Sequence, residues 1–271
     1  MQNVRKFWNG DMKQFANAKQ RFSNRVEDYI RYRPGYPAGV ISFLSENCGL
    51  LTGHIIADIG SGTGLLSKLF LDHGNHVYGV EPNAEMYAAG EEFLRDYPNF
   101  AGVNGSAEDT KLSTHSVDFV AAGQSFHWFD PIISRAEFSR ILKPGGWVVV
   151  IWNERILDST PFLRDYEALL YRFGTDYGKV SDSYPRLEKM RSFFVSETFL
   201  SHDLPNLQEF DFEGLSGRLR SSSYAPSADQ PNFLEMMTEL EHIFTAYQQD
   251  GKVRFDYHTR IYAGALDHHG N

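Results

Sequence analysis

The sequence predicts an α/β protein built on a doubly wound, mostly parallel sheet of seven strands, with an antiparallel C-terminal strand and a helical cap insertion. Two observations predict this class. Between residues 55 and 152, short apolar runs typical of buried strands alternate with segments whose apolar residues recur at helical spacing. In addition, the glycine-rich turn "GSGTG" at residues 60–64 lies between the first of these strands and the helix that follows it.

The chain before this turn is expected to contain two helices. Asn24 followed by Glu27 has the pattern of a capping box, and the short helix that it opens must end near Arg33 because a proline follows. Tyr29 and Arg33 share one face of this helix. After the turn "RPGYP", residues 38–47 are expected to form a second helix.

The segments around the glycine turn follow the order strand, turn, helix. "HIIADIG" has the apolar character of a buried parallel strand, and the helix from Leu65 to His73 is expected to end at Gly74. Further strands are predicted in "HVYGVE", "VDFVAAGQS" and "WVVVIW", and "NFAGVNGSAED" is predicted to contain a short strand and the loop that follows it. Further helices are predicted in "PNAEMYAAGEEFLRDYP" and from Pro131, which follows a capping aspartate.

After residue 152 the alternation changes. "STPFLRDYEALLYRFG" and "RLEKMRSFF" are predicted helices, whereas "LQEFDFEGL" and "KVRFDYHTRIYAGAL" are predicted strands that flank the helix "PNFLEMMTELEHIFTAYQQ" and close one edge of the sheet as an antiparallel pair. One domain over residues 1–271 is therefore expected. Its parts are an N-terminal lid (1–37), a cofactor-binding core (38–152), a helical cap (153–205) and C-terminal strands and helix (206–271).

Composition restricts the functional classes. The formal net charge of −9 disfavours a nucleic-acid partner, because binding to phosphate backbones normally requires a basic face. The single cysteine, Cys48, excludes an intrachain disulfide, and no Cys/His spacing indicates a metal site. The N-terminus lacks the apolar core of a signal peptide, and no membrane-spanning stretch occurs. We therefore expect a cytoplasmic protein without a metal, nucleic-acid or membrane partner and of unknown oligomeric state.

The glycine turn predicts a ligand at the carboxyl ends of the strands. A dinucleotide fingerprint also requires a glycine or alanine three positions after the second glycine of its pair. In one register that position is Leu65, and in the other it is Ser67. Neither register completes the fingerprint, so the sequence disfavours pyrophosphate binding.

"DIGSGTG" resembles the first motif of the class I S-adenosylmethionine-dependent methyltransferases, which have a Rossmann-like sheet. "GSAED" and "LKPGGWVVV" resemble further segments of the same family. "YRPGYP", "GQSFHWFD", "IWNER" and "TRIYAGAL" are similar to its small-molecule branch, which includes trans-aconitate methyltransferases. This resemblance implies S-adenosylmethionine as cofactor and methyl transfer to a small-molecule acceptor by in-line displacement.

The resemblance also implies roles for particular residues. Asp58 would lie near the ammonium and sulfonium side of the cofactor, Glu81 would bind both ribose hydroxyls, and Arg33 would pair with the cofactor carboxylate. Met86 would line the adenine pocket or belong to the core. The full predicted cofactor-binding set is Tyr29, Arg33, Asp58, Gly60, Ser61, Gly62, Gly64, Glu81, Pro82, Met86, Ser106, Ala107, Glu108, Gln124 and Ser125.

His127 is the candidate catalytic residue. It would orient or deprotonate an acceptor hydroxyl, or else pack with Trp128 as part of an aromatic cluster. Four aromatic residues from position 152 onward either shape an acceptor pocket or pack in the hydrophobic core: Trp152, Phe162, Tyr166 and Tyr224. Two other functions fit the sequence: a non-catalytic S-adenosylmethionine-binding module and, with less support, a nicotinamide-dependent oxidoreductase.

Overall fold

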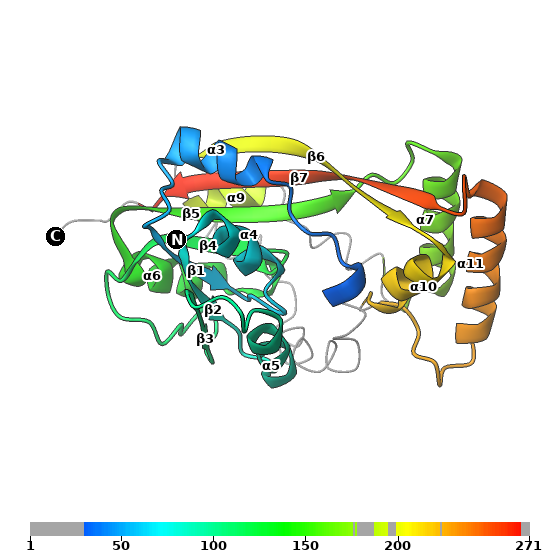
Figure 1. The fold of residues 1–271 in the computed structure, drawn as a ribbon, viewed down its shortest axis with the longest axis horizontal. Coiled ribbons are helices and arrows are strands. Elements are labelled where there is room, and N and C mark those ends of the chain that lie inside the picture. The colour runs from blue at the N-terminus through cyan, green and yellow to red at the C-terminus, as the bar shows by residue number, and fades with distance from the viewer. Residues whose placement is uncertain (1–29, 176, 178–186, 195–198, 223, 267–271) are drawn as a thin grey trace.

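The computed structural model describes residues 30–175, 177, 187–194, 199–222 and 224–266. Its centre is a seven-stranded sheet with the strand order β3-β2-β1-β4-β5-β7-β6 (Figure 1). Strand β7 runs antiparallel to both of its neighbours, and the pairs from β3 to β5 are parallel, which confirms the predicted fold class. The strands are β1 (Ile55–Ile59), β2 (His76–Val80), β3 (Phe100–Val103), β4 (Val117–Gly123), β5 (Leu142–Arg155), β6 (Leu200–Phe210) and β7 (Val253–Ala265).

Helices cover both faces of the parallel part of the sheet (Figure 1). On one face, apolar side chains of α3 (Gly39–Cys48) and α4 (Leu65–His73) pack against β1 and β4, with Leu44 and Phe70 fully buried. On the other face, α6 (Pro131–Ile141) and α9 (Leu187–Phe194) do the same. α5 (Ala84–Phe93) lies beside β3. Coverage on both faces explains the uninterrupted apolar strands.

The predicted helix ends are present where the local chemistry provides a cap. Gly74 ends α4 in the left-handed region, with φ of 97°, and its backbone N–H bonds back to the helix. The side chain of Asp130 accepts hydrogen bonds from the backbone N–H groups of Ile132 and Ile133, so α6 begins at Pro131. No helix within the described ranges is both long and apolar enough to cross a membrane.

Three helices pack together at the extended ends of three strands, beyond the parallel part of the sheet. β5 pairs with β4 only as far as Ile151, but it pairs with β7 through Arg155, and β6 accompanies β7 along the same extension. The far ends of these strands carry α7 (Pro161–Phe173), α10 (Phe212–Arg220) and α11 (Phe233–Tyr247) (Figure 1). These three helices and strand ends, here called the lobe, share a core that includes Phe162, Tyr166, Leu215, Leu240 and Phe255.

The prediction for "LQEFDFEGL" is wrong in its second half. β6 ends at Phe210, and the Asp211 side chain accepts a hydrogen bond from Gly214 N at 2.8 Å, which starts α10. The strand also begins earlier than expected, at Leu200, within the segment predicted to be a helical cap. The alternation of apolar residues continues past the strand end and concealed the helical spacing of Leu215 and Leu219.

Candidate functional site

A cleft of about 880 Å³, part of it open to solvent, lies at the carboxyl ends of β1, β4 and β5. This is the position where doubly wound sheets bind ligands. The lobe and the segment before α3 form its other walls. It is lined by Arg33, Pro34, Tyr36, Asp58, Gly60, Ser61, Gly62, Thr63, Leu65, Leu66, Gly123, Gln124, His127, Trp128, Trp152 and Tyr224.

The glycine loop presents backbone to this cleft. Gly62 has a φ of +56°, and a Cβ added there would meet no atom within 4 Å, so the loop is open on that side. Gly60, by contrast, is in tight contact: an added Cβ would lie 2.6 Å from the Cβ of Ser125. Ser125 donates a hydrogen bond from Oγ to Ile59 O at 2.7 Å and so fixes the loop after β4 against the end of β1. Of the two glycines, Gly62 leaves room for a ligand.

Asp58 is the buried charge of the cleft. Its side chain is 1% exposed, and Ser67 Oγ donates a 2.7 Å hydrogen bond to Oδ2. The other oxygen, Oδ1, is buried and accepts no hydrogen bond from any residue that the structure describes. Burial raises the pKa of this carboxyl to about 7, partly offset by the bonds from Ser67. A carboxylate with an unused oxygen in a cleft is a site for a cationic group.

Glu81 forms a hydrogen bond to the backbone of the glycine loop. Its carboxylate accepts hydrogen bonds from Gly62 N at 2.9 Å and from Asn83 N at 2.8 Å, and the residue is 8% exposed. The Asn83 side chain in turn caps α5 by accepting from the backbone N–H groups of Glu85 and Met86. Glu81 therefore connects the glycine loop to the start of α5. Because a carboxylate oxygen can accept more than one hydrogen bond, this supporting role is compatible with a contact to a ligand.

The segment "GSAED", residues 105–109, forms a tight turn after β3. Ser106 and Asp109 exchange backbone hydrogen bonds of 3.0 and 3.2 Å, and Ala107 between them is buried. Glu108 Oε1 accepts from Asp130 N at 2.9 Å, so this carboxylate joins the turn to the start of α6. The geometry accounts for Glu108 as a structural residue and leaves Ser106 partly exposed.

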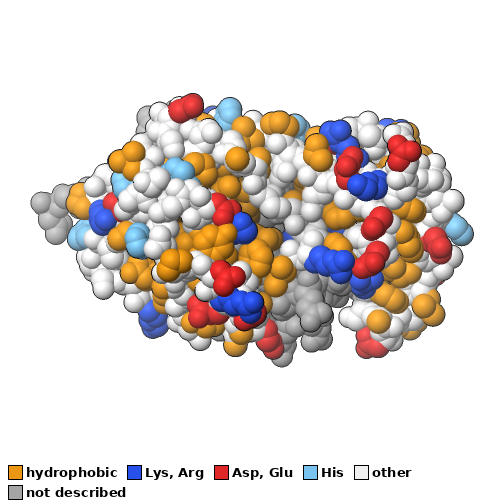
Figure 2. All heavy atoms as spheres, in the orientation of Figure 1, with side chains coloured by type: hydrophobic (Ala, Val, Ile, Leu, Met, Phe, Trp, Pro, Cys, Tyr) orange, Lys and Arg blue, Asp and Glu red, His pale blue; other side chains and the backbone are white. Residues whose placement is uncertain are grey.

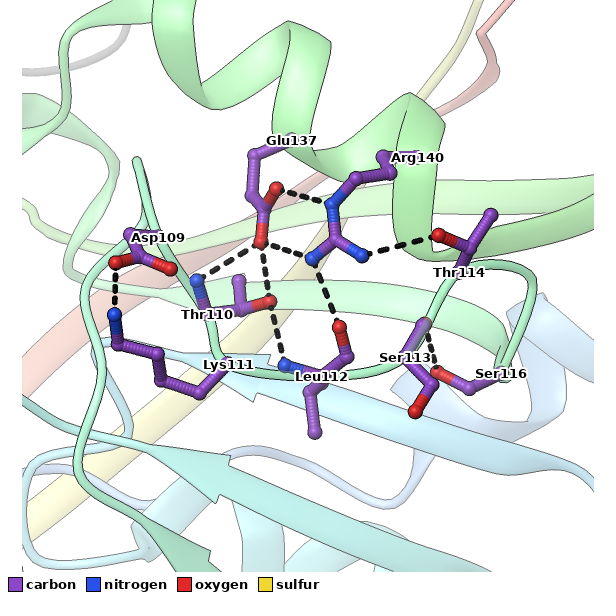
Figure 3. Close-up of polar contacts among 9 residues, drawn as sticks. All are labelled: Asp109, Thr110, Lys111, Leu112, Ser113, Thr114, Ser116, Glu137 and Arg140. Atoms are coloured by element: carbon purple, nitrogen blue, oxygen red, sulfur yellow. Dashed lines mark hydrogen bonds and ion pairs between the residues drawn. The ribbon is translucent and has the colours of Figure 1, made fainter.

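This turn is anchored to α6 by the half-buried carboxylate of Glu137 (Figure 3). Glu137 Oε1 accepts from Thr110 N at 2.9 Å and from Thr110 Oγ1 at 2.6 Å. Arg140 donates to both oxygens of Glu137 at 2.7 Å and also to Leu112 O at 2.8 Å. Burial opposes ionisation of Glu137, but the bonds from Arg140 and Thr110 outweigh it and lower its pKa to about 2. The anchor is charged throughout the physiological pH range.

His127 lies in an aromatic wall of the cleft. Its ring contacts Trp128 at a centroid distance of 4.4 Å and meets Trp152 edge-on at 5.0 Å. Burial, with the positive charge of Lys189, lowers the pKa of His127 to about 3, and its buried Nδ1 has no hydrogen-bond partner within the described part of the chain. The imidazole is therefore neutral at physiological pH.

Gln124 continues the same rim. It adopts a left-handed backbone with φ of 57°, and its side-chain amide donates to Asn153 O at 3.1 Å. Its Oε1 is buried and has no partner among the residues described. Left-handed backbone in a residue other than glycine is unusual and often accompanies functional sites.

Of the predicted cofactor-binding residues, six line the cleft together: Arg33, Asp58, Gly60, Ser61, Gly62 and Gln124. Arg33 also donates from Nη2 to Ser221 O at 2.8 Å, which links the segment before α3 to the lobe. Gly64, Glu81, Pro82, Met86, Ser106, Ala107, Glu108 and Ser125 lie outside the cleft lining just given, and Tyr29 is outside the described residues.

The sequence reasoning did not single out Thr63 or Tyr36. Thr63 lies within the glycine motif, and its buried Oγ1 has no hydrogen-bond partner in the described ranges, so the motif itself was an available signal. Tyr36 belongs to "RPGYP" and packs against Gly123, where its hydroxyl would lie 2.5 Å from an added Cβ. No local pattern indicates that contact, because it joins segments far apart in the chain.

Comparison with known proteins identifies a methyltransferase domain within the chain. Residues 57–150 match the family model described as a methyltransferase domain. An uncharacterized methyltransferase of Mycobacterium tuberculosis is 34% identical over 134 residues, which is 49% of this chain and 52% of the relative. An uncharacterized methyltransferase-like protein of Schizosaccharomyces pombe is 31% identical over 156 residues, or 57% and 59%. The chain thus spans 52 to 59% of the length of these curated relatives.

Solved structures share the fold at low identity. A protein assigned as a type II methyltransferase from Anaeromyxobacter dehalogenans superposes with a TM-score of 0.62 at 22% identity, covering 87% of this chain and 98% of that one. A phosphoethanolamine N-methyltransferase of Haemonchus contortus, solved with phosphomonomethylethanolamine and S-adenosylhomocysteine, gives 0.54 at 17% identity, with 93% and 59% covered. Residues 57–150 therefore contain a methyltransferase domain, and the chain shares the fold of these solved methyltransferases.

Proposed function

We propose that this chain transfers a methyl group from S-adenosylmethionine to a small-molecule acceptor. The observation that carries the proposal is the pairing of a buried carboxylate oxygen without a partner among the described residues, Oδ1 of Asp58, with bare backbone at Gly62 in one cleft. A ligand with a positively charged group on a narrow chain fits this arrangement, since the cation can lie at Asp58 and the chain at Gly62. A pyrophosphate does not fit, because the Asp58 carboxylate would repel it.

Two residues that line the cleft, and Glu81 outside its lining, fit this cofactor. Asp58 would stabilise the ammonium and sulfonium side, Gly62 would admit the methionine part close to the backbone, and Glu81 would accept hydrogen bonds from the ribose. S-adenosylmethionine supplies, when bound, a methyl group already activated by its positive sulfur. The protein then needs to align the two reactants and exclude water, which lowers the barrier by restricting their motion.

The aromatic wall supports that second task. Trp128 and Trp152 enclose His127 and present apolar surface to the cleft. A neutral imidazole with a pKa of about 3 is a weak base. Its low pKa favours a role in orienting the acceptor over a role in taking its proton. An acceptor that is already a nucleophile at neutral pH suits this site best.

Calorimetric titration with S-adenosylhomocysteine, run beside NADH, tests the cofactor assignment. We expect micromolar binding of S-adenosylhomocysteine and none of NADH. Glu81→Ala should weaken that binding about 10- to 100-fold, the range for hydrogen bonds to a charged group. Glu46→Ala, which removes an exposed carboxylate on α3, is the matched control.

Two results would count against this reading. Unchanged affinity in Glu81→Ala would refute the ribose contact, and binding of NADH alone would refute the methyltransferase assignment. Tight binding of S-adenosylhomocysteine with no methylated product across a broad acceptor panel would instead favour a non-catalytic binding module.

A further inference from the structure

The lobe holds two arginines in its interior. The side chain of Arg155, at the end of β5, is 8% exposed and forms an ion pair with Glu167. Its Nη2 also donates to Tyr177 Oη at 3.0 Å, and its guanidinium lies 5.1 Å from the ring centroid of Tyr166. Glu167 accepts from Tyr177 as well, so this carboxylate is shared between two partners.

Arg218, on α10, is 6% exposed. Its Nη1 donates to Ser222 Oγ at 3.1 Å and its Nε to Tyr257 Oη at 3.5 Å, which are neutral acceptors. Within the described ranges, no carboxylate forms an ion pair with Arg218, while Glu167 serves Arg155. The interior of the lobe therefore carries more positive than negative charge at this point, which is costly unless an anion is brought to it.

Two buried polar atoms in the same cluster are unsatisfied within the described part of the chain. Arg155 Nη1 and Tyr166 Oη each lack a hydrogen bond to any residue that the structure describes. Both can donate to an oxygen. A buried donor without an acceptor costs about 1 to 3 kcal/mol, so these atoms are a reason to expect a ligand oxygen nearby.

Tyr224 connects this cluster to the cleft. It is a lining residue of the cleft, and its ring packs on Tyr177 with centroids 4.8 Å apart. Burial by itself would raise the pKa of the Tyr224 phenol, but the positive charges of Arg218, Arg33 and Arg155 reverse the shift and hold the pKa below its ordinary value. An anion is therefore favoured at the position of the Tyr224 hydroxyl.

We infer that the lobe side of the cleft is an oxyanion subsite, formed by Tyr224 with Arg155 and Arg218 behind it, which holds a carboxylate or phosphate group of the methyl acceptor. This inference rests on the proposed function. The cleft then has two poles: Asp58 attracts the cationic cofactor at one end, and the arginines attract an anionic acceptor at the other. Opposite poles would orient the two reactants toward each other without a dedicated base.

The outer surface of the lobe provides the contrast. On the face shown in Figure 2, acidic and basic side chains are intermixed and form no patch of one sign. Arg172 on α7 is typical: its side chain is 59% exposed and pairs with Glu235. Positive charge without a matching carboxylate is therefore a feature of the lobe interior beside the cleft.

Binding of simple oxyanions to the protein loaded with S-adenosylhomocysteine tests the inference. Succinate and inorganic phosphate are the probes, and uncharged succinamide is the control for the carbon skeleton. Binding is followed by calorimetry and by the fluorescence of Trp152 and Trp128 in the cleft. We expect either oxyanion to bind at least 10-fold more tightly than succinamide, and the tighter of the two identifies the group of the natural acceptor.

Variants locate that binding. Arg218→Gln should weaken the tighter oxyanion about 10- to 100-fold, and Arg172→Gln, which removes the same charge from the surface of the lobe, should leave it unchanged. Circular dichroism and affinity for S-adenosylhomocysteine establish that each variant is folded. If Arg218→Gln does not fold, Tyr224→Phe and Arg218→Lys replace it, with a loss expected for the former and partial retention for the latter.

The two proposals fail in different ways. No binding of S-adenosylhomocysteine refutes the proposed function. Binding of S-adenosylhomocysteine together with oxyanion affinities equal to that of succinamide, or equal in the Arg218 and Arg172 variants, refutes the subsite and leaves the cofactor assignment intact.

Discussion

Replacing Asp58 by asparagine should make the protein more stable and less able to bind its cofactor. The pKa of Asp58 is raised from 3.8 to about 7, so the folded state binds a proton there that the unfolded state has already lost between these two pH values. Each pKa unit corresponds to about 1.4 kcal/mol. The shift of about 3 units implies a destabilisation on the order of 4 kcal/mol above pH 7, and none below pH 3.8.

The introduced asparagine can still accept the hydrogen bond from Ser67, so the variant removes mainly the charge. Urea unfolding followed by tryptophan fluorescence at about pH 5 and about pH 8 measures the effect. We expect the stability gained by Asp58→Asn to be several kcal/mol at the higher pH and clearly smaller at the lower one. The affinity of the unaltered protein for S-adenosylhomocysteine should rise with pH up to about 7 and then level off, because Asp58 must ionise to meet the cation.

Asp118→Asn is the control of opposite sign. Burial also opposes ionisation of Asp118, but the hydrogen bond from Ile55 N and the ammonium of Lys143 lower its pKa overall. Its contribution to stability is present above its ordinary pKa and is lost as the pH falls, so this variant should lose stability at about pH 8. Equal effects of Asp58→Asn at both pH values, or cofactor affinity unaffected by that change, would refute the reasoning about the buried charge.

Three other predictions follow from the site. Gly62→Ala should weaken S-adenosylhomocysteine binding at least 10-fold in calorimetry. Gly49 has a φ of +67° and equally open space, so Gly49→Ala should cause similar backbone strain of about 1 to 2 kcal/mol without loss of binding. Equal affinities of the two variants would contradict a close approach of the ligand to the glycine loop. His127 has a pKa of about 3, so its titration should not affect the turnover of an identified acceptor between about pH 5.5 and 8. If the pH profile shows an inflection in this range and His127→Asn removes it, His127 is the base. Glu137→Gln should lower thermal stability at neutral pH, and the difference should disappear as the pH falls from 4.5 through about 2, since Glu137 has a depressed pKa in contact with Arg140; a difference that persists at the lowest pH would exclude the charge as its cause.

Most of the sheet could be predicted from sequence because its strands are covered on both faces. Predominantly apolar runs such as residues 55–59 and 117–123 are typical of strands that helices cover on both sides. The same rule explains what was missed. β5 continues to Arg155, beyond the predicted run that ends at Trp152, and its last three residues are polar. Local hydrophobicity contains no signal for a strand outside the two-sided core.

The candidate site also contains residues that the sequence could predict and residues that it could not. Asp58 and the glycines are adjacent in the chain, so the motif alone brought them together. The sequence names Tyr224 as a pocket candidate and includes Arg155 in "IWNER", but nothing in the neighbourhood of Arg218 indicates a role. The three residues come together only in the folded lobe, through packing that involves α10 and β7. Aromatic residues expected to shape an acceptor pocket also separate in space: Tyr224 lines the cleft, whereas Phe162 belongs to the lobe core.

The lobe stands on strands that are continuous with the sheet, and this fixes how its distance from the cofactor end can change. Asn153 marks the junction: its side chain donates to Gly35 O at 3.2 Å and accepts from Thr259 Oγ1 at 2.5 Å. Side chains alternate between the two faces of a strand, so inserting one residue in β5, β6 and β7 would move the side chains that contact the lobe to the opposite face of each strand. Two residues would keep the faces and move the lobe by about 7 Å. Insertions in these strands can therefore adjust the distance between the lobe and the glycine loop to acceptors of different length only in steps of two residues.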